Sequence, residues 1–537
     1  MHAVANLPQP PDAAPGISIH HIHLANADTN SERTTEILGE LVASLVLSHS
    51  TRSTHPSLDS SSNISVDNRI DCAKRGVPHF PGADIPSPRS TGTPAPGGFD
   101  VTQLPVEIIC EIFEKFVEDD LLHPIRDDKA PRPRVSRICR SDPTKLGQIC
   151  SRWRTVAINL QKLWSNIFIY NPKHSQIHLT DIWLARSRNS PLNLIIDYDY
   201  CTGHDLESGA QILGSFIRHL DHCKQFHLNI SIKLLGLLSA LIDSPHKPPI
   251  LESVDLCFPD IFSHNNAEVH MDAIDAIWKY FHHCPSLRQV VWQADEVPSF
   301  PKHAPFQLTH VHARFCVSID DILTFLPQLP LIQELQIEDL SKGPPGPMSP
   351  PLLLQHLRLL RIRSHEIPAT SFIASLTCPS LETLVIIHSN FSDQSNQDLQ
   401  ALPRLLHRSA CRLQKLDLRD SGTNLTDEEW NRCLSNSPLQ FLMDLHLSTG
   451  SISDRVVGLL SRKSPAGLHE FAPFLEKLYI PSCETSDGLL ASMASSRWYK
   501  PLDDHNSMLL GHLRKAVIFP RHFGPIDEAF FSTNVLY

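Results

Sequence analysis

Histidine and cysteine side chains stand close together at two places in the sequence, where they could bind a metal ion. The first group is HHIH, residues 20–23, and the second is HHC, residues 282–284. Protein zinc sites need four such ligands, usually as two pairs at short spacings. Neither group has a second pair nearby, and none of the 13 cysteines belongs to a Cys-x-x-Cys motif. We therefore predict no metal site and expect free, buried cysteines in a reducing compartment.

Motifs that carry catalysis in other proteins are missing from the sequence. It contains no Gly-rich phosphate loop ending in Lys and Ser or Thr, no Gly-x-Ser-x-Gly and no His-Glu-x-x-His. Adjacent carboxylates occur at Asp320–Asp321 and Glu428–Glu429. Both pairs begin expected helices, where the helix dipole favours negative charge. We expect neither an enzyme nor a cofactor; an active site assembled from distant residues is the alternative.

Composition narrows the class of protein further. Of the 537 residues, 41% are hydrophobic and 20% are charged, and the net charge is -11. These values are ordinary for a soluble protein, and a mildly acidic chain without a long basic run argues against nucleic-acid binding. No apolar run reaches the roughly 18 residues that a membrane span needs. The N-terminus lacks the charged and apolar segments of a signal peptide, so we expect an intracellular protein, in the cytoplasm, the nucleus or both.

The first 99 residues have the composition of a largely disordered region. Residues 31–49 form an exception, because their apolar positions recur at helical spacing after a candidate N-cap at Ser31. From residue 50 to 98 the chain is rich in Ser, Thr, Pro and Gly and has few large apolar groups. Such a segment cannot bury enough apolar area to offset its conformational entropy. We predict disorder in residues 1–99 with one helix near 31–49.

Two apolar helical patterns follow, between residues 100 and 170. The first reads LPVEIICEIFEKFV from Leu104, and the second reads LGQICSRWRTVAINLQKLW and ends at Trp164. Each places large apolar residues on one face of a helix, and so short a segment cannot bury them all by itself. An insert of residues 118–143 separates the two patterns. An ordinary helical hairpin that caps the next domain would also explain them.

This segment resembles an F-box domain. The family's Leu-Pro-x-Glu-Ile-Leu-x-x-Ile-Phe pattern is matched from Leu104 to Phe113, its Cys-x-x-Trp-Arg by Cys150 to Arg154, and its Leu-Trp pair by Leu163 and Trp164. The long insert departs from the minimal pattern but is similar to inserts in F-box proteins of mushroom-forming fungi. The resemblance implies a Skp-type adaptor as partner. The contact residues it implies are Leu104, Pro105, Ile108, Ile109, Ile112, Phe113, Cys150 and Trp153.

A short unit recurs through the rest of the chain: Leu, two residues, an aliphatic residue, one residue and another aliphatic residue. Consecutive copies start 21 to 38 residues apart, and weaker candidates precede them near 192–196 and 226–230. The last three pattern positions alternate as in a strand, and helical patterns lie between copies, as at Ile274 to Phe281 and Ile319 to Leu326. The copies begin at Leu251, Leu287, Leu308, Ile332, Leu357, Leu381, Leu413, Leu442, Leu475 and Leu513.

Repeats of this kind predict a stacked α/β solenoid with parallel strands over residues 171–537. The region resembles irregular leucine-rich repeats, although the Asn or Cys that usually follows the strand is mostly missing. A βα domain with a closed core is the alternative. A Pro- and Gly-rich run at residues 341–351 predicts a projecting loop.

Polar residues beside the strand aliphatics are expected to face the concave side of such a solenoid. They carry both signs of charge, which suits a protein partner better than a polyanion; a solvated face without a ligand is the alternative. The candidate target-binding residues are Arg314, Glu334, Gln336, Arg361, Arg363, Lys415, Asp417, Arg419 and Tyr479.

Together the two resemblances imply a substrate receptor of a cullin–RING ubiquitin ligase. The helical segment would bind the Skp-type adaptor, and through it the cullin and RING subunits, while the repeats would bind an unknown target protein. The alternative is an interaction scaffold outside any ligase. The two hypotheses differ in whether the chain binds the adaptor.

Overall fold

The structure is a computed structural model, and the chain divides into two compact units. The expected helix at 31–49, the rest of 1–99 and the first histidine group lie outside the described residues, as do most of the insert and of the Pro-rich loop. The described residues are 104–533 except 123–142, 199–204, 243, 245, 260–266, 293–306, 342–349, 366–368, 389–395, 421–426, 435–436, 450–451, 464, 466–468, 498–512 and 521–523.

The larger unit is built on a parallel β-sheet, which has 13 strands within the described residues. The strands lie in the sheet in the same order as in the chain. They are β1 (Asn166–Tyr170), β2 (Leu192–Asp197), β3 (Cys223–Asn229), β4 (Ser253–Cys257), β5 (Gln289–Trp292), β6 (His310–Ser318), β7 (Glu334–Ser341), β9 (Leu359–Ser364), β11 (Thr383–His388), β12 (Lys415–Asp420), β13 (Asp444–Thr449), β14 (Lys477–Cys483) and β15 (Lys515–Pro520).

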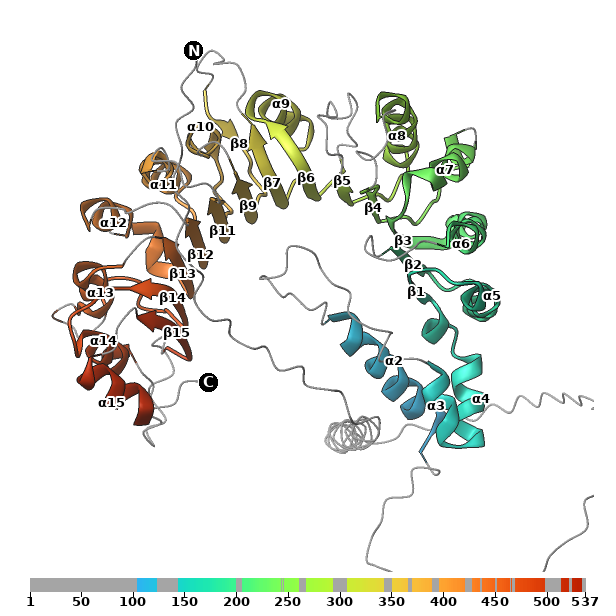
Figure 1. Ribbon diagram of the computed structural model, residues 1–537, viewed down its shortest axis with the longest axis horizontal. Helices are drawn as coiled ribbons and strands as arrows, with labels where there is room; N and C mark the ends of the chain where they lie inside the picture. Colours follow the sequence, from blue (N-terminus) through green and yellow to red (C-terminus); the bar gives the residue numbers. More distant parts are fainter. Residues whose placement is uncertain are drawn as a thin grey trace, which may run out of the picture. The chain divides into compact units, whose positions relative to one another are not determined.

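Helices connect most of the successive strands and cover one face of this sheet. Within the larger unit the strands line the inner side of an arc and the helices form its outer side (Figure 1). The helices are α5 (His174–Ser187), α6 (Leu206–Arg218), α7 (Leu235–Ile242), α8 (Ala267–His282), α9 (Ile319–Phe325), α10 (Thr370–Ala374), α11 (Asn396–Ser409), α12 (Asp427–Leu434), α13 (Asp454–Ser461), α14 (Leu489–Arg497) and α15 (Pro525–Thr533). Short 3-10 turns occur at η2 (Gln161–Trp164), η3 (Leu220–His222), η4 (Ile232–Leu234), η6 (Leu326–Gln328) and η7 (Ser437–Phe441).

The predicted α/β solenoid is confirmed, since all ten recurring units form neighbouring parallel strands. The two weaker candidates are strands as well, β2 and β3. β1 was not anticipated: it lies within residues 100–170, which the sequence assigned to the helical domain, but it pairs in parallel with β2. A second, two-stranded sheet joins β8 (Leu352–Leu353) to β10 (Leu376–Thr377).

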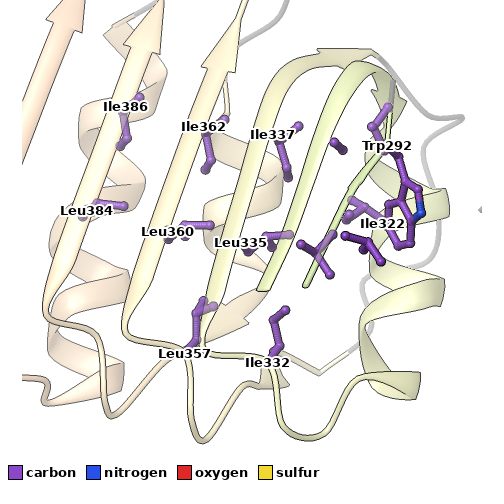
Figure 2. Packing of buried hydrophobic residues seen from close by; sticks show 14 of the residues in the cluster. Trp292, Ile322, Ile332, Leu335, Ile337, Leu357, Leu360, Ile362, Leu384 and Ile386 are labelled. Carbon is purple, nitrogen blue, oxygen red and sulfur yellow. The ribbon is translucent and has the colours of Figure 1, made fainter. Parts of the chain in front are cut away.

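The strand aliphatics stack into layers that form the core of the solenoid. Leu335, Leu360 and Leu384 are register neighbours on β7, β9 and β11, and each is fully buried. Figure 2 shows this layer beside a second one that contains Ile337 and Ile362. Burying one such side chain contributes roughly 1.5–3 kcal/mol. A single repeat has no partner for its apolar face, so the stacking of neighbours supplies this stabilisation.

The smaller unit is helical in its described part. It contains α2 (Val106–Leu122) and residues 148–156, which include the end of α3 (Pro143–Ile149) and most of α4 (Ser151–Asn159). The carbonyl of Pro105 accepts the hydrogen bond from the amide of Ile109, so the helical bonding begins one residue before α2. No helix in the described part of the chain has the length and apolar character to cross a membrane.

Candidate functional site

Strand register brings the predicted target-binding residues together on the inner face of the sheet. Inner and outer side chains alternate along a strand, and the buried Leu and Ile residues take the positions that face the helices. The remaining positions form rows across neighbouring strands. One row runs from β6 to β14 and consists of His312, Gln336, Arg361, Val385, Asp417, His446 and Tyr479.

Two further rows flank this one. Glu334 and Lys415 belong to the row toward the strand starts, and Arg363 and Arg419 to the row toward the strand ends. Arg314 lies within an irregularity in the β6–β7 register and pairs with Asp255 of β4 at 3.5 Å. All nine predicted residues therefore lie on strands of the main sheet, spread from β6 to β14.

A glutamate on β7 links a histidine and an arginine on neighbouring strands. Glu338 lies 3.1 Å from Nε2 of His312 and 3.1 Å from Nη1 of Arg363. Burial alone would raise the pKa of Glu338, but His312 and the nearby arginines lower it to about 2. Burial lowers the pKa of His312, and its hydrogen bond with Glu338 opposes that effect. Glu338 is not among the nine candidate target-binding residues, yet it links β6 and β9 across β7.

A second carboxylate makes the same kind of link on β12 and β13. Asp417 accepts two hydrogen bonds from Arg419 and lies 3.3 Å from Nδ1 of His446. The ring of Tyr479 contacts the ring of His446 at a centroid distance of 4.0 Å. Asp417 is only 2% exposed, so it is buried by its partners. Arg419, His446 and Tyr479 are therefore more accessible on this face than Asp417.

Two further charged pairs lie on this face. Lys415 lies 3.7 Å from Asp444, and His310 lies 3.6 Å from Glu334. These partly exposed pairs contribute little to stability, about 0–1 kcal/mol each. Their effect is to fix the positions of these side chains on the inner face. The inner face is thus a mixed surface whose charges are largely balanced among themselves.

The predicted adaptor-binding residues divide into a buried set and an exposed set. Five of the eight are buried and two, Ile108 and Cys150, are partly buried; the five are Leu104, Ile109, Ile112, Phe113 and Trp153. The rings of Phe113 and Trp153 meet edge to face at 4.9 Å. Nη2 of Arg152 donates to the carbonyl of Leu104 at 2.6 Å, and the Trp153 amide donates to Sγ of Cys150 at 3.4 Å. Of the eight, Pro105 is exposed.

Two exposed apolar residues of the smaller unit were not singled out from the sequence as contact residues. Val106 is 46% exposed and Ile149 is 50% exposed. Val106 lies three residues before Ile109, so helical periodicity assigns it to the buried stripe. In the structure, the packing of the helices buries Ile109 and leaves Val106 exposed. Trp164 of the larger unit is buried instead: it donates from Nε1 to the Ala157 carbonyl and packs against Trp183.

Of the two groups considered for metal binding, the structure describes residues 282–284, and their side chains do not converge. His282 is buried against the rings of Trp278 and Trp292, and His283 is exposed with its Nδ1 at the carbonyl of Lys279. Burial raises the pKa of Cys284 to about 12, which disfavours the thiolate that binds metals. Among the residues that the structure describes, no three His, Cys, Asp or Glu side chains are grouped so that they could hold a metal ion.

The fold and the inner face define a class of protein: a repeat protein whose parallel sheet presents side chains from many strands along one continuous surface. Such surfaces suit the binding of other proteins. No family model and no curated protein matches this chain.

Proposed function

We propose that this protein is the substrate-recognition subunit of a cullin–RING ubiquitin ligase. The observation that carries the proposal is the pairing of two different parts in one chain. The smaller unit carries the Leu104–Phe113 and Cys150–Arg154 motifs on helices, with a Phe113–Trp153 contact at its core. The larger unit is a parallel solenoid with a polar inner face. An adaptor-binding part and a target-binding part are what a substrate receptor requires.

The smaller unit would bind the Skp-type adaptor through the apolar residues that it leaves uncovered. Pro105 is exposed, and so are Val106 and Ile149. The buried members of the motif would keep the helices in place for this contact. Apolar anchors that become fully desolvated usually supply most of the binding free energy of an interface. Val106 and Ile149 are therefore added to Pro105 as proposed contact residues.

The larger unit would bind the target protein, and the chain itself would perform no chemistry. Holding a target near the ubiquitin-loaded enzyme raises the effective concentration of its lysines there. The mixed charges of the inner face suit a protein surface. A second candidate function, an interaction scaffold outside any ligase, shares the solenoid but not the adaptor.

A pull-down of the full-length chain with purified Skp-type adaptor tests the proposal. We expect the wild-type chain to retain the adaptor and the variant Val106→Glu/Ile149→Glu to lose it, because each glutamate would be desolvated in the interface. Ile526→Glu is the matched control, since Ile526 is 59% exposed on α15 of the larger unit. Circular dichroism checks that each variant is folded. A folded wild-type chain that does not retain the adaptor would favour the scaffold.

A further inference from the structure

Arg361 differs from the other arginines at the centre of the inner face. Arg363, two residues along β9, pairs with Glu338, and Arg419 on β12 pairs with Asp417. The side chain of Arg361 makes no hydrogen bond or ion pair with the described residues, and its Nε is buried without a hydrogen-bond partner. Three arginines on the same face thus have different environments, and one of them has a buried Nε without a partner.

The register neighbours of Arg361 explain why nothing on the face satisfies it. Gln336 lies beside it on β7 and Val385 lies beside it on β11, and neither can supply an anion. On β11 the inner positions Val385 and Ile387 are both apolar and are 6% and 8% exposed. An apolar neighbourhood lowers the local dielectric, so an unpaired cation there is costly and a bound anion is held more strongly.

The acidic residues nearest to this position are already in use. Glu338 is close enough that Arg361 contributes, as the weakest of several causes, to its lowered pKa. However, Glu338 is bound by His312 and Arg363. Asp417 is bound by Arg419 on the far side of Val385. The side chain of Gln336 also makes no hydrogen bond with the described residues, so its amide donor is available beside the guanidinium.

We propose that Arg361 and Gln336 form a subsite that binds an Asp or Glu side chain of the target protein. The guanidinium would donate two parallel hydrogen bonds to the carboxylate, which is the geometry that this group matches best. The Gln336 amide would donate to the same carboxylate. This inference rests on the proposed function and names the chemistry of the target segment: a stretch that carries at least one acidic residue.

Selection of a random 12-residue peptide library displayed on phage against the full-length chain tests the subsite. We expect the selected peptides to be enriched in Asp or Glu. For one selected peptide, changing the acidic residue to its amide should weaken binding about tenfold, as should Arg361→Gln in the protein. Once either change has been made, the other should have little additional effect. A selection without acidic enrichment, including one that yields no binder, would overturn the proposal.

Arg358 provides the matched control for this experiment. It precedes β9 by one residue, is exposed and carries the same charge, so Arg358→Gln changes the net charge equally. It should leave peptide binding unchanged. Equal losses in the two variants would indicate long-range attraction in place of a defined subsite. A further arm uses the same peptide with phosphoserine at the acidic position; much tighter binding than with Glu would reassign the subsite to phosphate.

Two more measurements keep the inference separate from folding and from the proposed function. Arg361→Met should not lower the thermal unfolding temperature, because the native guanidinium has no partner to lose; a drop as large as that of Arg419→Met would overturn the proposal. Arg361→Gln should retain the Skp-type adaptor as well as the wild-type chain does. If neither protein binds the adaptor while the peptide preference remains, the ligase function fails and the carboxylate subsite stands.

Discussion

Arg419 binds Asp417 through two hydrogen bonds, from Nε to Oδ1 at 2.9 Å and from Nη2 to Oδ2 at 2.7 Å. His446 of the adjacent strand lies 3.3 Å from the same Oδ1. The carboxylate of Asp417 is therefore surrounded by partners from β12 and β13 and is almost completely buried. Arg419 and His446 both contact this one carboxylate. Asp417 therefore holds inner-face side chains of two neighbouring repeats in place.

Asp417→Asn should destabilise the solenoid by about 2 kcal/mol, because Arg419 would lose its charged partner while remaining partly buried. The partial exposure of Arg419 limits the effect. Urea unfolding measures it. Asp444→Asn is the control: Asp444 meets Lys415 at 3.7 Å and is more exposed, so its loss should cost about 0.5 kcal/mol. Equal effects would contradict the structural role of Asp417.

His282 should make stability depend on pH. Burial, with a smaller contribution from His283, lowers the pKa of His282 to about 3, whereas an unfolded histidine has a pKa of about 6.5. Above pH 6.5 both states are neutral. Between these values the unfolded chain binds a proton that the folded chain does not, so stability falls as pH falls, by up to about 1.4 kcal/mol per pH unit.

Urea unfolding at pH 7 and pH 5 measures this term. His282→Phe keeps a ring beside Trp278 and Trp292 and removes the titrating group, so the loss of stability between the two pH values should be smaller than in the wild-type chain. Other buried histidines titrate in both proteins and cancel in the difference. His283→Gln, at an exposed position, should behave like the wild type. An unchanged pH dependence in His282→Phe would show that His282 is protonated normally.

Arg497 should stabilise the C-terminal repeats through backbone carbonyls. Its guanidinium donates to the carbonyls of Leu460, Ala472 and Phe471 at 2.6, 2.9 and 2.5 Å. Arg497→Lys keeps the charge but cannot reach three carbonyls in a plane, so we expect a loss of about 2–3 kcal/mol. Arg455→Lys is the control, because Arg455 is exposed. Hydrogen exchange should accelerate in α13 and α14 of Arg497→Lys; unchanged protection there would contradict this role.

The solenoid could be predicted from the sequence because its signal is local. In LETLVI the aliphatic residues mark a short strand, and the ten copies mark the stack. β1 was missed because NIFIY stands alone, without the leading leucine of the repeat, directly after a helical pattern. The alternation along each strand also predicted that the nine candidate residues lie on the inner face of the sheet. A strand's two faces follow from its own sequence.

Which inner-face side chains have a charged partner could not be predicted in this way. In the strand LLRIRS the two arginines look equivalent, but Arg363 meets Glu338 and Arg361 meets no acid, because the partners come from β7 and β11. Pairing depends on register between segments more than twenty residues apart. The same limit applied to Val106, whose exposure depends on helix packing rather than on periodicity.

Trp153→Ala should unfold the smaller unit rather than merely remove a contact with a partner. Trp153 is 3% exposed and Phe113 is fully buried, with their rings 4.9 Å apart. Removing a buried aromatic side chain costs about 3–5 kcal/mol, whereas Ile149→Ala, at a half-exposed position, should cost within about 0.5 kcal/mol.

Hydrogen exchange followed by mass spectrometry distinguishes the two variants, because it reports on each helix separately. In Trp153→Ala the amides of α2 should lose protection while those of α8 and α11 keep it. In Ile149→Ala protection should be unchanged throughout, and a loss of adaptor binding would then report a true contact. Full protection of α2 in Trp153→Ala would mean that the Phe113–Trp153 contact does not hold the helices together, and Trp153 would have to act through a partner instead.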